Sequence, residues 1–463
     1  MTALHDLSAV ELLAHYKSKK LSPVEVTQAV IDRIEAWESK LKALYAPDFE
    51  GARREAQESE RRWQKGEPKG ALDCVPITIK ENIATRGVPV PLGTAATELV
   101  PAAADAPAAA RVREAGAVIL AKTTMPDYGM LSSGRSSFHP LTRNPWNLAW
   151  NPGGSSAGAG AAVAAGYGPL HLGTDIGGSV RLPATWNGIF TLKPSLGRVP
   201  VDPPYFGRVV GPMTRIVADA ALLMAELAKP DWRDHMSLPP ATLDWRAGSL
   251  EPKGLKIGLH LDAGSGLPVE PAVKAAIEKA ARRFAEAGAV IEPVAPFLSP
   301  EMLHLQDLFW RVRSWVDFSA LSHQRQARVL PFIADWCRGG ADVSGTTVIR
   351  TVSNYMAIRA AALKATHGFD YVLSPVSPVP TYRAEWETPT NDVTRPLEHI
   401  SFTMPYNMSE QPAASINCGY TSEGKPIGLQ IAGRRFNDLG VLRLAHWFEA
   451  ARDPQRTWPE PPK

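Results

Sequence analysis

Residues 173–181 read Gly173-Thr174-Asp175-Ile176-Gly177-Gly178-Ser179-Val180-Arg181, and this segment says more about fold and chemistry than any other in the chain. It places one hydroxyl directly after two glycines, with a run of backbone N–H groups around it. Such a turn suits a nucleophile whose oxyanion hole comes from the backbone. A second turn, Gly153-Gly154-Ser155-Ser156, precedes it, and Lys80 lies further upstream. The arrangement indicates hydrolytic chemistry that uses no histidine.

Strand and helix patterns alternate outward from this segment. Alternation of this kind predicts an α/β fold: one large domain over residues 1–463, with a mixed, twisted sheet covered by helices on both faces. The Pro230–Pro252 stretch resembles a loop and is a candidate boundary. Strands are predicted at 75–79, 117–121, 255–259, 290–293 and 371–375, helices at 7–17, 22–37, 106–115, 157–165 and 271–287, a long ordered loop at 126–155, an aromatic-rich helical region at about 300–345, and a strand followed by a helix after Pro412.

Composition excludes several classes of protein. A chain that is 44% hydrophobic and 21% charged buries a core rather than staying disordered. The net charge of +3 is spread along the chain, so no nucleic-acid groove is indicated. The three cysteines form no C-x-x-C pair, and we expect no disulfide, metal or cofactor. With no secretory leader and no apolar run that could span a bilayer, we expect a cytoplasmic protein without a membrane partner.

A lysine base replaces the usual histidine in this interpretation. None of the 11 histidines has a recognisable catalytic context, and no G-x-S-x-G motif is present. Lys80 ends the apolar strand Val75–Ile79, where burial would lower its pKa by the roughly 3 units that a base near neutrality requires.

These motifs together resemble the amidase signature family of serine amide hydrolases. The similarity is dense over about 70–220 and lighter over 370–440. The matching segments are Leu72-Asp73-Cys74-Val75-Pro76-Ile77-Thr78-Ile79-Lys80-Glu81-Asn82, Asn151-Pro152-Gly153-Gly154-Ser155-Ser156-Ala157-Gly158, the segment from Gly173 to Ala184, Gly211-Pro212-Met213-Thr214-Arg215 and Pro426-Ile427-Gly428-Leu429-Gln430.

The resemblance implies a role for each catalytic position. Ser179 would be the nucleophile, Ser155 the bridging serine after a cis peptide bond, and Lys80 the base. The proton would pass from Ser179 through Ser155 to Lys80 and then to the leaving nitrogen. The oxyanion would be held by the backbone N–H groups of Ile176, Gly177, Gly178 and Ser179.

The same resemblance suggests supporting roles for further residues. Asp175 would orient the turn, Arg181 would pair with a buried carboxylate, and Ser156 would hydrogen-bond Lys80 or nearby backbone. The loop that lines the pocket in relatives suggests substrate contacts by three residues here, Met130, Ser132 and Ser133.

The chain departs from the family pattern at Cys74, Ala157 and Asn417-Cys418-Gly419. These changes leave the three catalytic positions intact. Ile176 and Leu182 replace the threonine and glutamine associated with the tRNA-dependent amidotransferase subunit, which disfavours that role.

We therefore expect an amidohydrolase for small to medium, apolar or aryl amides, with esterase or carbamate (urethane) hydrolase activity as extensions. Two alternatives stay open: a glutamine-hydrolysing amidotransferase subunit that needs partner chains, and a catalytically silent binding scaffold. The only partner expected of a stand-alone enzyme is a small amide or carbamate. The sequence leaves monomer and homodimer open.

Overall fold

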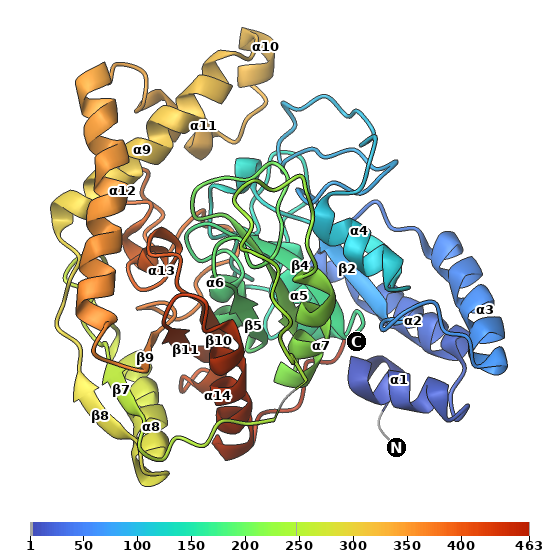
Figure 1. Ribbon diagram of the computed structural model, residues 1–463. Helices are drawn as coiled ribbons and strands as arrows, with labels where there is room; N and C mark the ends of the chain where they lie inside the picture. The colour runs from blue at the N-terminus through green and yellow to red at the C-terminus, as the bar shows by residue number, and fades with distance from the viewer. Residues whose placement is uncertain (1–2, 247, 463) are drawn as a thin grey trace.

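A mixed sheet of 11 strands forms the frame of the molecule (Figure 1). The structure is a computed structural model that describes residues 3–246 and 248–462. The strands lie in the order β1-β3-β2-β4-β6-β5-β10-β11-β9-β7-β8. Their bounds are β1 Leu44–Tyr45, β2 Pro76–Lys80, β3 Val118–Thr123, β4 Leu170–Asp175, β5 Phe190–Lys193, β6 Val209–Thr214, β7 Lys256–Leu259, β8 Val290–Pro293, β9 Tyr371–Pro375, β10 Ala413–Tyr420 and β11 Pro426–Gly433.

Helices surround this sheet. The α-helices are α1 Ala9–Lys17, α2 Pro23–Leu41, α3 Phe49–Lys65, α4 Pro107–Glu114, α5 Ala157–Ala165, α6 Arg181–Asn187, α7 Val217–Leu227, α8 Pro271–Glu286, α9 Pro300–Ser319, α10 His323–Gln326, α11 Pro331–Arg338, α12 Gly345–Thr366, α13 Met404–Met408 and α14 Asp438–Ala451. Short 3₁₀ turns in the described residues cover Leu4–Asp6, Asp127–Gly129 and Glu398–Ile400.

The sheet has parallel strands near both edges and antiparallel strands in its middle. Strand β2 pairs in parallel with β3 and β4, and β7 pairs in parallel with β8 and β9. Strands β6, β5, β10 and β11 pair in antiparallel fashion between these two groups. The predicted fold class, a mixed sheet with helices on both faces, is confirmed.

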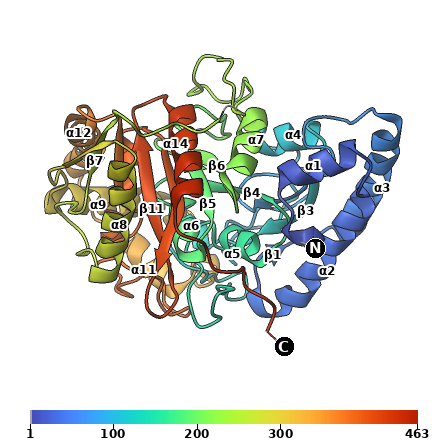
Figure 2. The same cartoon turned by 90° about the horizontal axis from the view of Figure 1, so that it is seen from below.

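The two faces of the sheet carry different layers. One face packs against α4, α7, α8 and α14 in the largest apolar cluster of the molecule. The other face is covered by α5 and α6, as the view from below shows (Figure 2). Helices α9, α11 and α12 form a second apolar cluster with Leu182 and Trp186 of α6, the helix that follows β4. The site described below lies beside this second cluster.

Local sequence signals explain several of these elements. Ser22 caps α2 through the backbone N–H groups of Val24 and Glu25, and the Glu25 side chain completes the capping box. Helix α5 contains only Ala, Gly and Val and is wholly buried. A Cβ atom at Gly158 would overlap the carbonyl oxygen of Ala43, so the small residue permits α5 to pack against the neighbouring backbone.

Most predicted elements are confirmed, with shifted ends. Helix α5 and strand β9 have the predicted bounds, whereas α2 extends to Leu41 rather than residue 37. The 126–155 segment is a loop whose one regular element is the turn Asp127–Gly129. Sequence patterns did not identify β4, β5, β6, α7 or α12. The loop-like stretch at 230–252 does not separate two sheets, because strands on both sides of it share one sheet.

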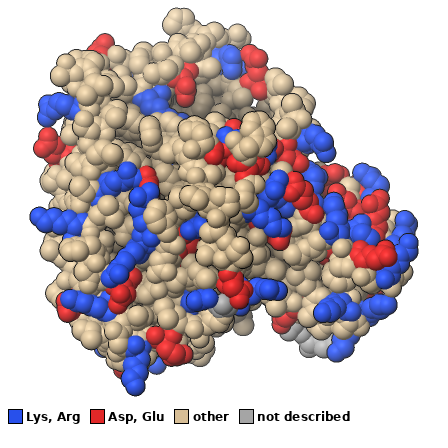
Figure 3. Space-filling view, viewed as in Figure 1, with Lys and Arg blue, Asp and Glu red and all other residues tan. Residues whose placement is uncertain are grey.

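Acidic and basic side chains are mixed over the face shown in Figure 3, which is hollowed near its top. This face has no broad patch of one sign. Within the described residues, no helix is long and apolar enough to cross a membrane.

Candidate active site

Lys80 and Thr174 lie side by side at the carboxyl ends of two neighbouring strands. Lys80 ends β2, Thr174 is the second-last residue of β4, and the two strands are parallel neighbours. Their carboxyl ends therefore lie side by side, and Lys80 Nζ donates to Thr174 Oγ1 over 2.9 Å. Asn82 Nδ2 donates to the same hydroxyl oxygen over 3.1 Å. Thr174 thus holds the ammonium group in place.

Ser155 is the second partner of Lys80. The distance from Lys80 Nζ to Ser155 Oγ is 2.8 Å, and the peptide bond between Gly154 and Ser155 is cis, as the resemblance implied. Both side chains are buried. Complete burial lowers the pKa of Lys80 to about 7, because the charged form loses its hydration; Asp175 and Glu81 oppose this shift and Arg208 adds to it. A fraction of Lys80 is therefore neutral at physiological pH.

Ser179 lies between β4 and α6 and is only partly buried. The backbone N–H of Ser156 donates to the carbonyl oxygen of Ser179 over 3.2 Å, which joins the two Gly-Gly-Ser turns. Ser156 Oγ is bonded to the backbone of Thr174, accepting from its N–H and donating to its carbonyl oxygen. Of the two partners predicted for Ser156, the structure therefore shows the nearby backbone and not Lys80.

The backbone around Ser179 has three N–H groups without a hydrogen-bond partner among the described residues, rather than the four that were expected. The Gly178 N–H donates to Asp175 Oδ1 over 2.8 Å, so the expected oxyanion donor at Gly178 is already occupied. Within the described residues, the N–H groups of Ile176, Gly177 and Ser179 form no hydrogen bond. Gly178 has a φ of +133°, and a Cβ atom there would overlap the hydroxyl of Thr403. Glycine is required at this point of the turn.

A buried ion pair stabilises the turn that contains Ser179. Arg181 binds Asp175 through two hydrogen bonds of 3.0 Å, and both side chains are fully buried. Burial alone would raise the pKa of Asp175, but the charge and hydrogen bonds of Arg181 and a bond from Asn407 hold it well below its ordinary value. Arg181 also reaches Gln430 and the carbonyl oxygen of Thr403. The carboxylate that sequence reasoning left unnamed as the partner of Arg181 is Asp175.

A pocket opens at Ser179. Ile176, Gly177 and Met130 line it beside the serine. Its wall is mostly apolar and comes from four parts of the chain: Leu131, Leu182, Trp310, Leu397 and Ile400. The pocket is thus shaped for an apolar group next to the hydroxyl.

Ser132 and His399 add a neutral polar pair to this pocket. Ser132 Oγ and His399 Nε2 are 2.7 Å apart. Burial lowers the pKa of His399 to about 3, so its ring is neutral at physiological pH, and its Nδ1 has no partner within the described residues. Sequence reasoning missed His399 because no local motif surrounds it. Ser133, by contrast, donates to the carbonyl oxygen of Trp386 and does not line the pocket.

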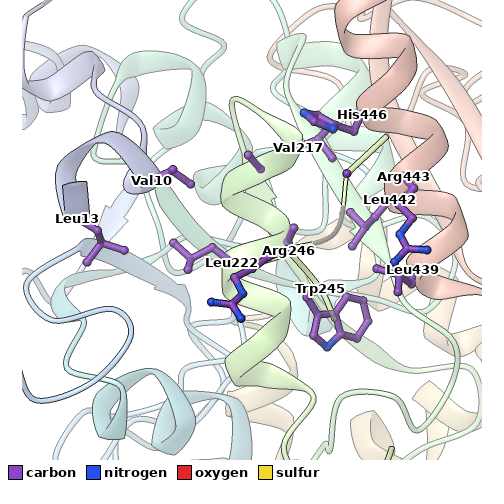
Figure 4. Close-up of a pocket in the computed structure, with 13 residues that line it drawn as sticks. Val10, Leu13, Val217, Leu222, Trp245, Arg246, Leu439, Leu442, Arg443 and His446 are labelled. Carbon is purple, nitrogen blue, oxygen red and sulfur yellow. The ribbon is translucent and has the colours of Figure 1, made fainter. Parts of the chain in front are cut away.

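A larger apolar pocket lies elsewhere, among α1, α7 and α14 (Figure 4). The ring of Trp245 lies between α7 and α14 at this pocket. Its described lining residues include no serine, cysteine or carboxylate. It therefore lacks the groups for hydrolysis that surround Ser179. Over the described part of the chain, no cluster of His, Cys, Asp and Glu suits a metal ion.

Comparison with known sequences gives consistent matches along nearly the whole chain. A sequence profile described as "Amidase" matches residues 25–442. An acylamidase of Rhodococcus erythropolis is 33% identical, with 97% of this chain and 96% of that protein covered. A glutamyl-tRNA(Gln) amidotransferase subunit of Myxococcus xanthus is 32% identical, with 97% and 98% covered.

Solved structures agree with the sequence matches. A bacterial aryl acylamidase of the amidase signature family has a TM-score of 0.90 at 32% identity, covering 97% of each chain. A 6-aminohexanoate cyclic dimer hydrolase bound to its substrate has a TM-score of 0.87 at 25% identity, covering 97% of this chain and 98% of that one.

Proposed function

The chain belongs to the amidase signature family, and from this premise we propose that it hydrolyses small to medium apolar or aryl amides through an acyl-enzyme on Ser179. Members of the family are hydrolases of C–N bonds, and this chain is such an enzyme. One observation carries the proposal: the buried Lys80, with its lowered pKa, is hydrogen-bonded to Ser155 in the turn that adjoins Ser179.

In the proposed reaction, Ser179 Oγ attacks the carbonyl carbon of the amide. Its proton passes to Ser155 while Ser155 gives its own proton to neutral Lys80. The protonated lysine then returns a proton through Ser155 to the leaving nitrogen, because an amine anion is a very poor leaving group. Water attacks the acyl-enzyme by the same proton path in reverse.

The oxyanion of each tetrahedral intermediate would be held by the backbone N–H groups of Ile176, Gly177 and Ser179. Their hydrogens have no protein partner within the described residues, as an oxyanion hole requires before substrate binds. Loss of one such donor typically costs about 3 kcal/mol of transition-state stabilisation. Asp175 and Arg181 support the turn without contacting substrate.

The substrate preference is proposed from the wall of the pocket. Trp310, Leu182 and Ile400 suit an aryl or alkyl group, and the two relatives named for acylamidase activity are consistent with this. Ester and carbamate hydrolysis use the same attack on a carbonyl carbon, so we extend the proposal to both. No metal or cofactor enters the mechanism. The three cysteines are free, which fits a reducing cytoplasm.

A second candidate is the glutamine-hydrolysing subunit of an amidotransferase, favoured by the similarity to the Myxococcus xanthus protein. It would need partner chains. Ile176 and Leu182 both line the pocket, so their departure from the pattern of that subunit falls where substrate binds. A silent scaffold is disfavoured by the intact contacts among Lys80, Ser155 and Thr174.

The test is a parallel assay of matched chromogenic anilide, alkyl amide, ester and carbamate substrates with an added glutamine assay. We expect the purified chain to hydrolyse the apolar anilide and the Ser179→Ala variant to be inactive. Activity on glutamine alone, or full activity in Ser179→Ala, would contradict the proposal.

A further inference from the structure

Two arginines near the active site have no carboxylate partner among the described residues. Arg313, on α9, lines the pocket that contains Ser179 and also the adjoining pocket, which opens beside Asn82 and Met130. Arg208, just before β6, lines this second pocket. The two pockets share Met130 and Arg313, so they are two arms of one site: an apolar arm and an arginine arm.

Tyr205 holds both guanidinium groups in this second arm. The Cζ atom of Arg313 lies 4.3 Å from the centre of the Tyr205 ring, and that of Arg208 lies 5.4 Å from it. Stacking on an aromatic ring fixes the direction of a guanidinium without neutralising its charge. Both guanidinium groups therefore lie against the ring of one tyrosine.

The charges of this pair are not balanced by ion pairs. Asp202 and Asp317 line the same arm, but both are exposed and neither forms an ion pair with Arg208 or Arg313. Among the described residues, the guanidinium of Arg208 donates one hydrogen bond, to the carbonyl oxygen of Pro203, and the guanidinium of Arg313 donates none. Burial and the nearby Arg313 lower the pKa of Arg208 to about 10, which records the cost of this arrangement. An anion bound beside the guanidinium groups would offset part of that cost.

Building on the proposed function, we propose that the arginine arm binds a carboxylate of the substrate. The preferred substrates are then amides with an aryl or alkyl group on one side of the scissile bond and a carboxylate on the other. Carboxylate matches the guanidinium fork in geometry and charge. Apart from Arg313, which both arms share, the described lining of the apolar arm has no charged side chain, because its Ser132–His399 pair is neutral.

The position of Arg208 gives this arm a link to the reaction. Its positive charge is one of the effects that lower the pKa of Lys80. The charge of Arg208 therefore favours the neutral form of Lys80, which is the base in the proposed mechanism.

The test measures equilibrium binding by calorimetry to the Ser179→Ala variant, so that no turnover is needed. The first pair of ligands is adipic acid mono-(4-nitroanilide) and the matching adipamide 4-nitroanilide, in which a neutral amide replaces the carboxylate. In the second pair, the carboxylate or its neutral amide is on the amine side of the scissile bond. These ligands are N-hexanoyl-5-amino-2-nitrobenzoate and the corresponding nitrobenzamide. The two pairs cover both orientations of the substrate in the site.

In at least one pair, we expect the carboxylate to bind about tenfold more tightly than its neutral match. Adding Arg313→Gln or Arg208→Gln to Ser179→Ala should remove most of this preference. Arg350→Gln, an exposed arginine of α12, is the matched control and should preserve it. Equal or weaker binding of both carboxylates, or a preference that persists in both glutamine variants, would overturn the inference.

Failure of this inference is distinguishable from failure of the proposed function. Hydrolysis of the neutral 4-nitroanilide by the unmodified chain tests the function, whereas the binding preference in Ser179→Ala tests the arginine arm. An active enzyme without the preference would refute the inference and leave the proposed function intact.

Discussion

The surroundings of Lys80 and Lys122 differ in one respect that bears on catalysis. The two lysines lie on the neighbouring strands β2 and β3, and both are buried. Burial lowers the pKa of each to about 7. Lys80 donates to Ser155 beside an open pocket, whereas Lys122 donates to Thr85 Oγ1 over 2.6 Å and to the carbonyl oxygen of Ile83.

This comparison teaches that a lowered pKa does not by itself make a lysine a base. Lys122 donates to the Thr85 hydroxyl and the Ile83 carbonyl oxygen, and among the described residues neither acceptor leads to a nucleophile. In the proposed mechanism, Lys80 has a proton path to Ser179 through Ser155. The difference lies in the hydrogen-bond partners, and substitutions of those partners can test it.

The largest effect is expected from replacing each lysine in turn. Lys80→Met should lower kcat/KM for a neutral anilide by about 10⁴-fold, because it removes the general base. Lys122→Met, the matched control, should lower it less than about tenfold, since this lysine takes no part in proton transfer. Steady-state assays with folding checked by circular dichroism measure both. Equal losses in the two variants would show that Lys80 has no catalytic role beyond that of Lys122.

Ser155→Ala should be the next most severe change. It keeps both Lys80 and Ser179 but removes the hydroxyl between them, and we expect kcat to fall by about 10³-fold. KM should change little, because Ser155 does not line the substrate pocket. A variant with near-normal kcat would show that the proton reaches Lys80 by another path.

The pH dependence of kcat/KM should follow Lys80. Its neutral form is the base, so activity should be lost as the pH falls through about 7, roughly tenfold per pH unit, and should level off above about pH 8. His171, His260 and His399 have pKa values lowered to about 3 or 4 by burial and stay neutral over this range. Measurement of kcat/KM for the unmodified chain from about pH 5 to pH 9 tests this. A flat profile would contradict it.

The smallest effect is expected at the threonines that hold the two lysines. Thr174→Val removes one acceptor of Lys80 and should lower kcat about tenfold through misplacement of the amine. Thr85→Val makes the same change beside Lys122 and should leave kcat within about twofold. If both variants lost activity alike, the effect would be general destabilisation of the sheet edge.

Much of the fold could be predicted because its elements have local signals. Ser22 and Pro23 begin a helix, and an apolar run ending at Lys80 forms a strand, in the sequence as in the structure. Strands β4 and β6 were missed because glycine or proline interrupts their strand pattern, and β5 was missed because it is only four residues long. Tertiary pairing in the centre of the sheet decides their structure.

The candidate site, too, could be predicted only in part from the sequence. Lys80, Ser155 and Ser179 stand in recognisable motifs, so their positions could be identified from sequence. Thr174, His399 and Arg313 could not, because their relevance depends on elements brought together by the fold: β4, the turn at Glu398–Ile400 and α9. The occupied N–H of Gly178 was equally hidden, since only the structure shows how the Asp175 carboxylate is directed.

The most direct test of the central claim is labelling with a fluorophosphonate probe, followed by mass spectrometry of the labelled peptide. We expect one phosphonyl group on Ser179, added at a rate that is unchanged in Lys122→Met and strongly reduced in Lys80→Met. Ser179→Ala should not be labelled. Labelling that persists in Ser179→Ala, or that is equally fast in Lys80→Met, would contradict it.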